Sequence, residues 1–194
     1  MRRLVLLLAA TTLWAADDFT LYDLLAPSTH SFDIVYDVTQ TREGSPYLYN
    51  PIRPGSVATH ERAIDLATGK PLELAVVDGK SAKAAGGVGP RTADDAQYLR
   101  VKLLGPVPKG AETRIRIYKT YTDPASYYEK DDGFVFERPL GIKRNLVVLP
   151  KGYELIGSAS PAIVSTGADG RIRASFLNDR DDQLPVRIVG RKAK

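Results

Sequence analysis

Hydrophobic and polar positions alternate with a period of two along most of this chain. Phe32, Ile34 and Val38 fall on one face of an extended backbone, whereas Asp33 and Asp37 fall on the other face. Successive side chains of a strand point to opposite faces, so this pattern is typical of a strand with one buried face. The segment around residue 35 is therefore predicted to be a half-buried strand.

Two hairpins are predicted in the first half of the chain. Residues 57–66 and 72–77 flank a short segment that contains Gly69, and glycine permits the positive φ of a tight turn. Residues 97–104 and 113–122 flank a segment rich in proline and glycine, and they form the second predicted hairpin. Its inward positions are Leu99, Val101, Leu103, Ile115 and Ile117.

Short strands with regular turns are also predicted in the second half. They are placed at residues 134–136, 146–149, 155–158, 163–166, 171–177 and 186–189. The polar stretch 123–133 is rich in turn formers and is predicted to separate a half at 16–122 from a half at 134–194. This spacing predicts an all-β fold, an antiparallel β-sandwich with two sandwich-like halves packed together.

Two segments depart from this alternation. Residues 20–25 are predicted to form one or two helical turns, capped by Asp17 or Asp18 and ended by Pro27. Residues 80–96 collect small and polar side chains without a hydrophobic period. Such a segment buries too little apolar area to offset its ordering entropy, so it is predicted to be a mobile loop.

The first fifteen residues have the composition of a secretory leader. Arg2 and Arg3 precede a mostly apolar run at 4–13, and Ala15 provides a small residue for cleavage. The apolar run is shorter than the roughly 20 residues that a membrane-spanning helix needs. We therefore predict a signal peptide at 1–15 and a secreted or periplasmic protein. The absence of cysteine and of any Asn-x-Ser/Thr sequon favours a bacterial origin.

Charge gives little indication of a nucleic-acid partner. Without Arg2 and Arg3 the chain has 25 basic and 23 acidic residues, a formal charge of +2. The signs alternate along the predicted strands instead of gathering into one basic block. The composition therefore predicts a solvated surface of mixed charge and no nucleic-acid binding.

Three short motifs each lack a residue that their chemistry requires. His60-Glu61 begins like a zinc-protease signature, but Ile64 stands where the second histidine ligand belongs. Residues 78–81 resemble the end of a phosphate-binding loop, but Leu74 stands where that loop requires glycine. His30 lies among serines in the approach to a strand, a poor geometry for nucleophilic attack. We therefore predict no catalytic residue, cofactor or metal ligand, and a protein that is not an enzyme.

One cluster of acidic residues is a candidate calcium site that the sequence neither supports nor excludes. Asp179, Asp181 and Asp182 form a loose group of carboxylates in a predicted turn. Their spacing is not that of an EF-hand, and alternate acids in a turn are usually solvated. Calcium binding at these residues is left undecided by the sequence.

Tyrosines provide the candidate binding surface. Tyrosine combines a large contact area with few rotatable bonds and a polar tip, as protein and sugar contacts require. Packing in the core or at a sheet edge is the structural alternative for such residues. The predicted binding residues are Tyr47, Tyr49, Ile52 and Arg53, with Tyr127 and Tyr128 as neighbours.

Two segments of the chain resemble a known family. Residues 106–110, followed by the alternating segment 113–118, form one of them, and residues 149–155, followed by 169–171, form the other. Both resemble the amino-terminal β-sandwich of M1-type zinc aminopeptidases. In those enzymes the sandwich lies against a helical zinc module with a His-Glu-x-x-His motif, which this sequence lacks. The resemblance therefore implies the fold and no peptidase activity.

The sequence as a whole predicts an exported, non-catalytic module for protein–protein interaction or assembly. The partner would be an envelope or extracellular protein, or a second copy bound through an unpaired edge strand. A carbohydrate-binding domain is the first alternative, and it requires at least two coplanar, exposed tyrosine rings on one face. A hydrolase is the second, and it requires His30 or His60 in a cleft within about 3 Å of a carboxylate.

Overall fold

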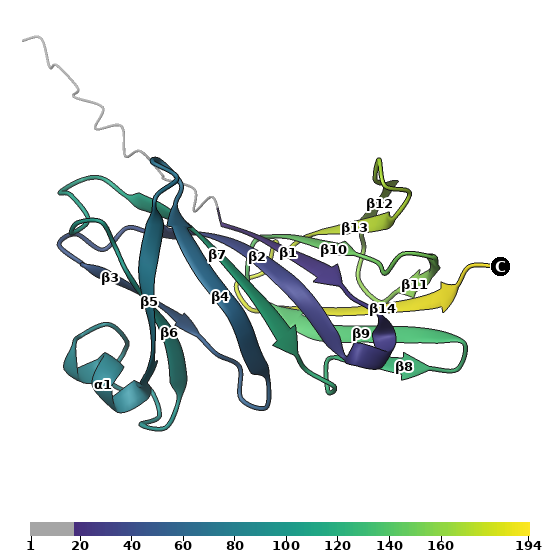
Figure 1. Ribbon diagram of the computed structural model, residues 1–194, viewed down its shortest axis with the longest axis horizontal. Coiled ribbons are helices and arrows are strands. Elements are labelled where there is room, and N and C mark those ends of the chain that lie inside the picture. The colour runs from purple at the N-terminus through teal and green to yellow at the C-terminus, as the bar shows by residue number, and fades with distance from the viewer. Residues whose placement is uncertain (1–17) are drawn as a thin grey trace, which may run out of the picture.

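The protein consists almost entirely of β-strands arranged in two sheets (Figure 1). The structure, a computed structural model, describes residues 18–194. The predicted signal peptide and Asp17, one of the two predicted caps, lie outside the described residues. All strand pairs are antiparallel except one, since β1 and β10 run parallel with Phe19 opposite Arg144. The predicted all-β sandwich is confirmed.

The larger sheet has ten strands and the smaller sheet has four. In spatial order the larger sheet comprises β12 (Ile163–Thr166), β13 (Ile172–Leu177), β10 (Arg144–Val148), β1 (Phe19–Leu24), β2 (Ser31–Gln40), β7 (Thr113–Thr122), β4 (Val57–Asp65), β5 (Pro71–Asp78), β6 (Gln97–Lys102) and β3 (Tyr47–Pro51). The smaller sheet comprises β11 (Tyr153–Ser158), β14 (Leu184–Lys192), β9 (Gly133–Leu140) and β8 (Tyr127–Lys130). A 3-10 turn at Pro27–Thr29 and a short helix, α1 (Gly79–Ala84), complete the secondary structure of residues 18–194.

The alternation that predicted β2 corresponds to its burial. Phe32, Ile34 and Val38 are buried, whereas Asp33 is exposed. Asp37 is the exception on the polar face, because its carboxylate accepts two hydrogen bonds from the Arg116 guanidinium, at 2.6 and 2.7 Å. The ion pair lets a charged residue of the strand be buried without an unsatisfied group.

Two hydrophobic clusters form the core, and they correspond to the two lobes seen side by side in Figure 1. The first cluster is rich in aromatic rings and lies between the β1, β2, β10 and β13 region and the four-stranded sheet; Phe32 and Phe136 meet there edge to face at 5.5 Å. The second cluster is mainly aliphatic and lies where β5, β6 and β3 turn over β2, β7 and β4. Tyr36 packs against both clusters and so marks the seam between them.

One predicted hairpin is confirmed and the other is wrong. Strands β4 and β5 pair at Ala63 and Leu72, and Gly69 in their turn has a φ of 71°. Strand β6 instead pairs with β5 and β3, while β7 pairs with β2 and β4. The five inward positions predicted for the second hairpin all lie in the second cluster. Their apolar faces therefore meet across the two layers of the sandwich, and the intervening segment connects the layers.

The predicted helical turn at residues 20–25 is wrong. The segment forms β1, which pairs with β2 on one side and with β10 on the other. Thr20, Tyr22 and Leu24 are buried in alternation with partly exposed neighbours. The backbone N–H and C=O groups of this segment form hydrogen bonds with two neighbouring strands. These bonds outweigh its weak local preference for a turn of helix.

The predicted mobile loop at residues 80–96 is also wrong, because the segment is folded onto the sheet. The Asp78 side chain caps α1 by accepting a hydrogen bond from the Ser81 N–H at 2.7 Å, and Ala82 is completely buried. The Lys83 ammonium donates to the Thr92 carbonyl at 2.7 Å and pairs with Asp94. A cap, one small buried residue and one lysine bridge thus order a segment without a hydrophobic period.

The predicted boundary at residues 123–133 contains β8 and several buried groups. Tyr127 is fully buried, and the Asp123 carboxylate accepts hydrogen bonds from the Ser126 N–H at 3.1 Å and from its hydroxyl at 2.7 Å. The first cluster includes residues from both sides of this segment. A division of the chain into halves at this segment stays a prediction.

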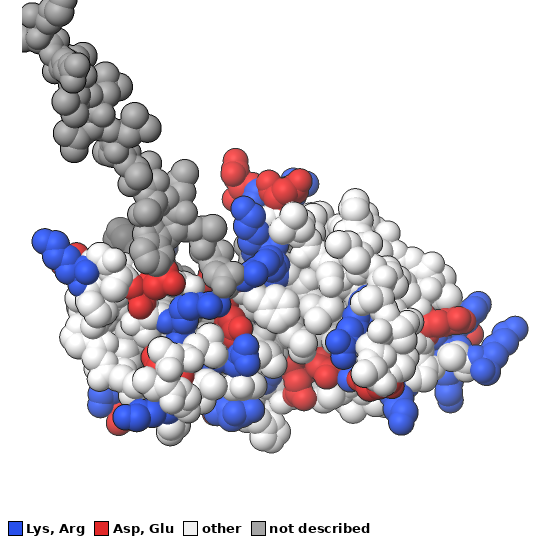
Figure 2. Space-filling view, turned by 90° about the horizontal axis from the view of Figure 1, so that it is seen from above, with Lys and Arg blue, Asp and Glu red and all other residues white. Residues whose placement is uncertain are grey.

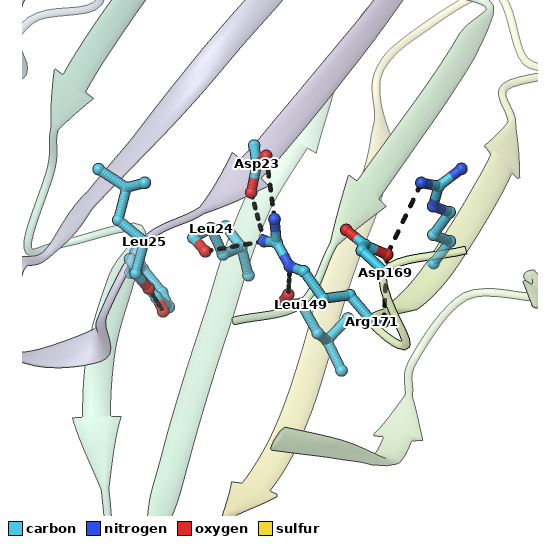
Figure 3. A network of polar contacts seen from close by, with 8 residues as sticks. Asp23, Leu24, Leu25, Leu149, Asp169 and Arg171 are labelled. Atoms are coloured by element: carbon cyan, nitrogen blue, oxygen red, sulfur yellow. Dashed lines mark hydrogen bonds and ion pairs between the residues drawn. The ribbon is translucent and has the colours of Figure 1, made fainter. Parts of the chain in front are cut away.

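An arginine joins three strands at one end of the first cluster (Figure 3). The Arg171 guanidinium forms a bidentate pair with the Asp23 carboxylate at the end of β1, and donates to the Leu149 carbonyl at 2.8 Å and to the Leu24 carbonyl at 3.3 Å. Asp169 accepts a hydrogen bond from the Arg171 N–H at 3.2 Å. This network fixes the start of β13 relative to β1 across β10.

Candidate functional site

The predicted tyrosine surface begins on β3, which forms one edge of the ten-stranded sheet. The rings of Tyr47 and Tyr49 meet edge to face, with centroids 6.2 Å apart and planes at 67°. Tyr49 and Tyr98 are arranged similarly, at 6.5 Å and 76°. These half-buried rings do not form the coplanar pair that the carbohydrate-binding alternative requires.

Tyr49 packs beneath the segment that follows α1. A Cβ placed on Gly87 would lie 2.1 Å from the Tyr49 ring, so this glycine allows the backbone to cross directly over the ring. The Tyr49 hydroxyl is buried and has no hydrogen-bond partner. Tyr49 therefore anchors a cover over β3 and presents little surface to a ligand.

The other predicted binding residues have different surroundings. Ile52 and Arg53 are half-buried just beyond β3, where the Ile52 N–H donates to the Gln97 carbonyl at 2.9 Å. Tyr127 belongs to the first cluster, and its hydroxyl donates to the Leu25 carbonyl at 2.7 Å. Burial raises the pKa of Tyr127 well above its usual range. Tyr128 on β8 is half-buried, and a binding role for this set of residues stays a prediction.

Neither histidine has the geometry that a hydrolase requires. A ring nitrogen of His30 lies 3.1 Å from the Tyr127 carbonyl, and one of His60 lies 3.2 Å from the Thr59 hydroxyl. His60 lies in a β-bulge of β4 and has a φ of 55°. Within residues 18–194, neither ring forms a hydrogen bond or an ion pair with a carboxylate.

The acidic turn contains an internal ion pair. The Asp182 carboxylate accepts a hydrogen bond from the Arg180 Nε at 2.6 Å, and this bond lowers the pKa of Asp182. Asp179 and Asp181 are exposed in the same turn. No group of three or more histidine, aspartate or glutamate side chains is placed to hold a metal ion in the described part of the chain.

The opposite edge of the ten-stranded sheet, β12, is open and apolar. Ile163 is 76% exposed and Val164 is 50% exposed, and Leu177 on the neighbouring β13 is 62% exposed. A groove of about 770 Å³ begins at Ile163 on this edge and extends inward past β13 and β10 to Phe19 on β1. Its apolar lining comes from Phe19, Pro161, Ala162, Ile163, Phe176, Leu177 and Leu184. The sequence predicted the strand but did not place it at an edge.

A second and smaller cavity, of about 180 Å³, lies at the seam between the two clusters. Lys119 on β7 reaches it with a side chain that is buried, and its ammonium donates to the Asn50 Oδ1 at 2.5 Å. Burial lowers the pKa of Lys119 to about 8, and the nearby Arg138 charge adds to this effect. Sequence analysis did not select Lys119, although it follows Ile115 and Ile117 at the same spacing and so falls on the inward face of the strand.

Surface charge does not point to a polyanionic partner. On the face shown in Figure 2, basic and acidic side chains are interspersed and form no single-sign stripe. This arrangement agrees with the mixed surface predicted from the sequence. None of the helices in residues 18–194 has the length and apolar character needed to cross a membrane.

Comparison with known proteins finds similar folds among solved structures. No family model matches the chain, and no curated protein matches it. The M1 zinc metallopeptidase from Deinococcus radiodurans superposes with a TM-score of 0.54 at 11% identity, covering 89% of this chain and 40% of the enzyme. An aminopeptidase N family protein from Idiomarina loihiensis gives a TM-score of 0.49 at 11% identity, covering 90% of this chain and 29% of that protein.

The similarity to the Deinococcus enzyme is one of fold. It confirms, at that level, the resemblance to the amino-terminal β-sandwich of M1-type zinc aminopeptidases. The chain spans about two fifths of the length of that enzyme. An identity of 11% does not extend the comparison to activity.

Proposed function

We propose that this chain is an exported, non-catalytic β-sandwich module that binds an extended polypeptide segment of a partner protein along β12. The observation that carries the proposal is the unprotected state of this edge. An open edge strand presents unpaired backbone donors and acceptors that a segment of another protein can complete. The groove that begins at Ile163 and extends inward past β13 and β10 offers apolar surface to a side chain that reaches in from the added strand.

The other sheet edges have protective features that β12 lacks. Strand β8 carries the charged residues Glu129 and Lys130, and β11 is interrupted by a bulge between Leu155 and Gly157. Strand β3 is covered by the segment around Gly87. Charges, bulges and covers are the usual means by which proteins prevent edge pairing. Strand β12 consists of Ile-Val-Ser-Thr and has none of these features.

A partner segment suits this edge better than a second copy of the chain. Pairing of two β12 strands would join only four residues from each copy. Stable protein interfaces bury roughly 1,200–2,000 Å² in total, which so short a ribbon does not provide. A peptide that places side chains in the groove gains contact area beyond the strand itself.

A non-catalytic role is supported by the surroundings of the histidines. His30 and His60 contact a carbonyl and a threonine hydroxyl, neither of which carries the negative charge with which a carboxylate stabilises the imidazolium of a general base. The peptidases of similar fold are much longer chains, of which this chain matches about two fifths. We propose the binding function of a β-module for this chain and no peptidase chemistry.

The test is a selection of peptides against the open edge. A phage-displayed library of random peptides is selected on the protein, and the recovered peptides are resynthesised for titration. We expect Ile163→Lys to reduce their affinity at least roughly tenfold, because a charge would be placed in the path of the added strand. The matched control is Ile156→Lys on β11, since Ile156 is 52% exposed at another edge. Hydrogen exchange of residues 163–166 should slow when peptide is bound.

Two outcomes would contradict the proposal. Peptides that bind the Ile163→Lys variant as tightly as the original protein would place the site elsewhere. Sedimentation of a dimer that Ile163→Lys abolishes would show a second copy as the occupant of this edge.

A further inference from the structure

The cavity at the seam of the two clusters lies in the gap between β3 and β9, the two strands that pack over the central sheet there. Strand β3 covers the central sheet from one side, and β9 covers it from the other. Between them, the cavity reaches the inward side chains of β1, β2 and β7. Asn50 of β3 and Arg138 of β9 form two of its walls. The cavity therefore belongs to the meeting of both lobes and lies apart from the β12 edge.

Lys119 brings a positive charge into this cavity without a salt bridge, because the carboxylate that acts on it, that of Glu61, lies beyond ion-pair distance. Its side chain is 7% exposed, and its ammonium has as partners the Asn50 Oδ1 at 2.5 Å and the Tyr121 hydroxyl at 3.3 Å. Across the described residues, no carboxylate lies within ion-pair distance of this ammonium. A buried charge that only neutral groups solvate is costly, so an anion in the cavity would be stabilised.

Arg138, the other cation of the cavity, is already neutralised. Its guanidinium donates to the Asp123 carboxylate at 3.0 Å, and both side chains are almost completely buried. The Ser56 and Ser126 hydroxyls also donate to this carboxylate, at 3.1 and 2.7 Å. Lys119 is therefore left without a salt bridge, and Glu61 attracts its charge only from beyond ion-pair distance. An anion inside the cavity would supply the close partner that Lys119 lacks.

A second buried group in the cavity also lacks a partner. Thr20 is 2% exposed and lines the cavity from β1, yet its hydroxyl oxygen forms no hydrogen bond. Buried hydroxyls in proteins are nearly always satisfied, so an unpaired one indicates a polar group still to be supplied. This observation is independent of the lysine charge and indicates the same cavity.

The remaining walls are apolar or aromatic. Ile34, Pro51 and Ile142 line the cavity together with the tyrosine rings. An engineered cavity of about 150 Å³ holds a single aromatic ring, so a space of this size accommodates a small apolar body and not a drug-sized molecule. The cavity thus combines one buried lysine without a salt bridge, one unsatisfied hydroxyl and a small apolar volume.

We propose that this cavity binds a monocarboxylate carried on a small apolar body, with Lys119 as its counter-ion and the Thr20 hydroxyl as a further polar contact. A singly charged carboxylate matches the single charge of Lys119, whereas a dianionic phosphate would leave a buried negative charge. Two sources can supply this chemistry. One is a free small organic acid, and the other is the terminal carboxylate of a peptide chain.

Titration of the folded protein with benzoate tests the proposal. We expect saturable binding of benzoate, and binding of the uncharged isostere benzamide that is at least roughly tenfold weaker. Lys119→Met keeps the length of the side chain but removes the charge, and it should weaken benzoate binding at least roughly tenfold. The matched control is Lys102→Met, because Lys102 is exposed on β6 and pairs with Glu73. Thermal melts verify that each variant is folded.

Thr20→Val tests the second contact while the lysine charge is kept. It removes the unpaired hydroxyl at nearly constant volume, and we expect it to weaken benzoate binding severalfold. If Thr20 does not contact the ligand, Thr20→Val should stabilise the protein and leave its affinity for benzoate unchanged. That result would exclude Thr20 from the site.

A pair of peptides distinguishes the two sources of the carboxylate. A short peptide with a free terminal carboxylate is compared with its amidated form, both in competition with benzoate. Competition by the free-acid peptide alone identifies a polypeptide terminus as the ligand, whereas benzoate binding without peptide competition identifies a free organic acid. The proposal is overturned if benzoate does not bind at up to about 10 mM, if benzamide binds equally well, or if Lys119→Met changes nothing.

Discussion

The two ends of the ten-stranded sheet contrast in how their edges are treated. At the β3 end, Gly87 crosses over Tyr49, and the Tyr47 carbonyl accepts hydrogen bonds from the Gln40 amide at 3.0 Å and from the Ser45 hydroxyl at 2.8 Å. At the β12 end, Ile163 and Val164 are exposed and nothing in the described chain covers them. The contrast shows that one edge strand of the sheet is covered by other parts of the chain, whereas the other edge strand is exposed.

The largest expected effect is a pH dependence of stability that arises from Lys119, which lies in the middle of the sheet where β3 stops covering it. Burial lowers the pKa of Lys119 to about 8 from 10.5, so the unfolded chain binds more protons between these two pH values. Stability should therefore rise as the pH increases through this window, by roughly 3 kcal/mol in total. Lys119→Met should lack this part of the rise, which denaturant titrations at several pH values would measure.

The tyrosines near Lys119 also titrate at high pH and affect stability there. The contribution of Lys119 is therefore taken as the difference between the pH profiles of the original protein and of Lys119→Met. Equal pH profiles for both proteins would show that the lysine is solvated. The cover formed by β3 would then end before it reaches Lys119.

The next largest effect should come from breaking the cover itself. Gly87→Val places carbon atoms into the Tyr49 ring, and we expect it to reduce the free energy of unfolding by roughly 1–3 kcal/mol. Gly89→Val is the matched control, because nothing lies within 4 Å of a Cβ at Gly89. Chemical denaturation measures both, and equal losses would show that the segment after α1 is not packed on β3.

A smaller effect of opposite sign is expected at Tyr49. Tyr49→Phe removes a buried hydroxyl that has no hydrogen-bond partner, so it should stabilise the protein by about 1 kcal/mol. Tyr98→Phe on β6 provides a comparison within the same group of rings. A loss of stability in Tyr49→Phe, measured by thermal denaturation, would reveal a partner for this hydroxyl.

The smallest effect on stability should occur at the open end. Val164→Asp changes a residue that is 50% exposed and unpaired on its outer side, so the midpoint of unfolding should stay within about 0.5 kcal/mol of the original. Leu72→Asp on β5 is the contrasting variant, because Leu72 is 8% exposed in the second cluster. A large loss in Val164→Asp would mean that the β12 edge is covered after all.

The faces of strands could be predicted from the sequence, whereas their neighbours could not. The alternation along β2 separates buried Phe32 from exposed Asp33, because side-chain direction is a local property of an extended chain. The inward positions of β6 and β7 were also correct, yet Val101 and Ile117 belong to one cluster on strands that do not pair with each other. A period of two indicates which face is buried, but it carries no information about which strand lies alongside.

The candidate sites were harder to predict for two different reasons. The segment after Asp78 folds through a cap and a glycine contact with Tyr49, and neither produces a hydrophobic period. Lys119 carried a usable indication, since a lysine at an inward position of a strand is a buried charge. It was not among the predicted site residues, and lysines are seldom fully buried unless they are paired. The openness of β12 follows only from the strand order of the folded sheet.

The parallel pair of β1 and β10 has a consequence for the order in which the protein is built. Phe19 can find its second neighbour only after Arg144 has emerged from the ribosome, so β1 stays unpaired on that side until late in synthesis. Contacts of such long sequence separation delay folding, because a large loop must close before they form. The first strand of the fold therefore takes its final place only after most of the chain has been made.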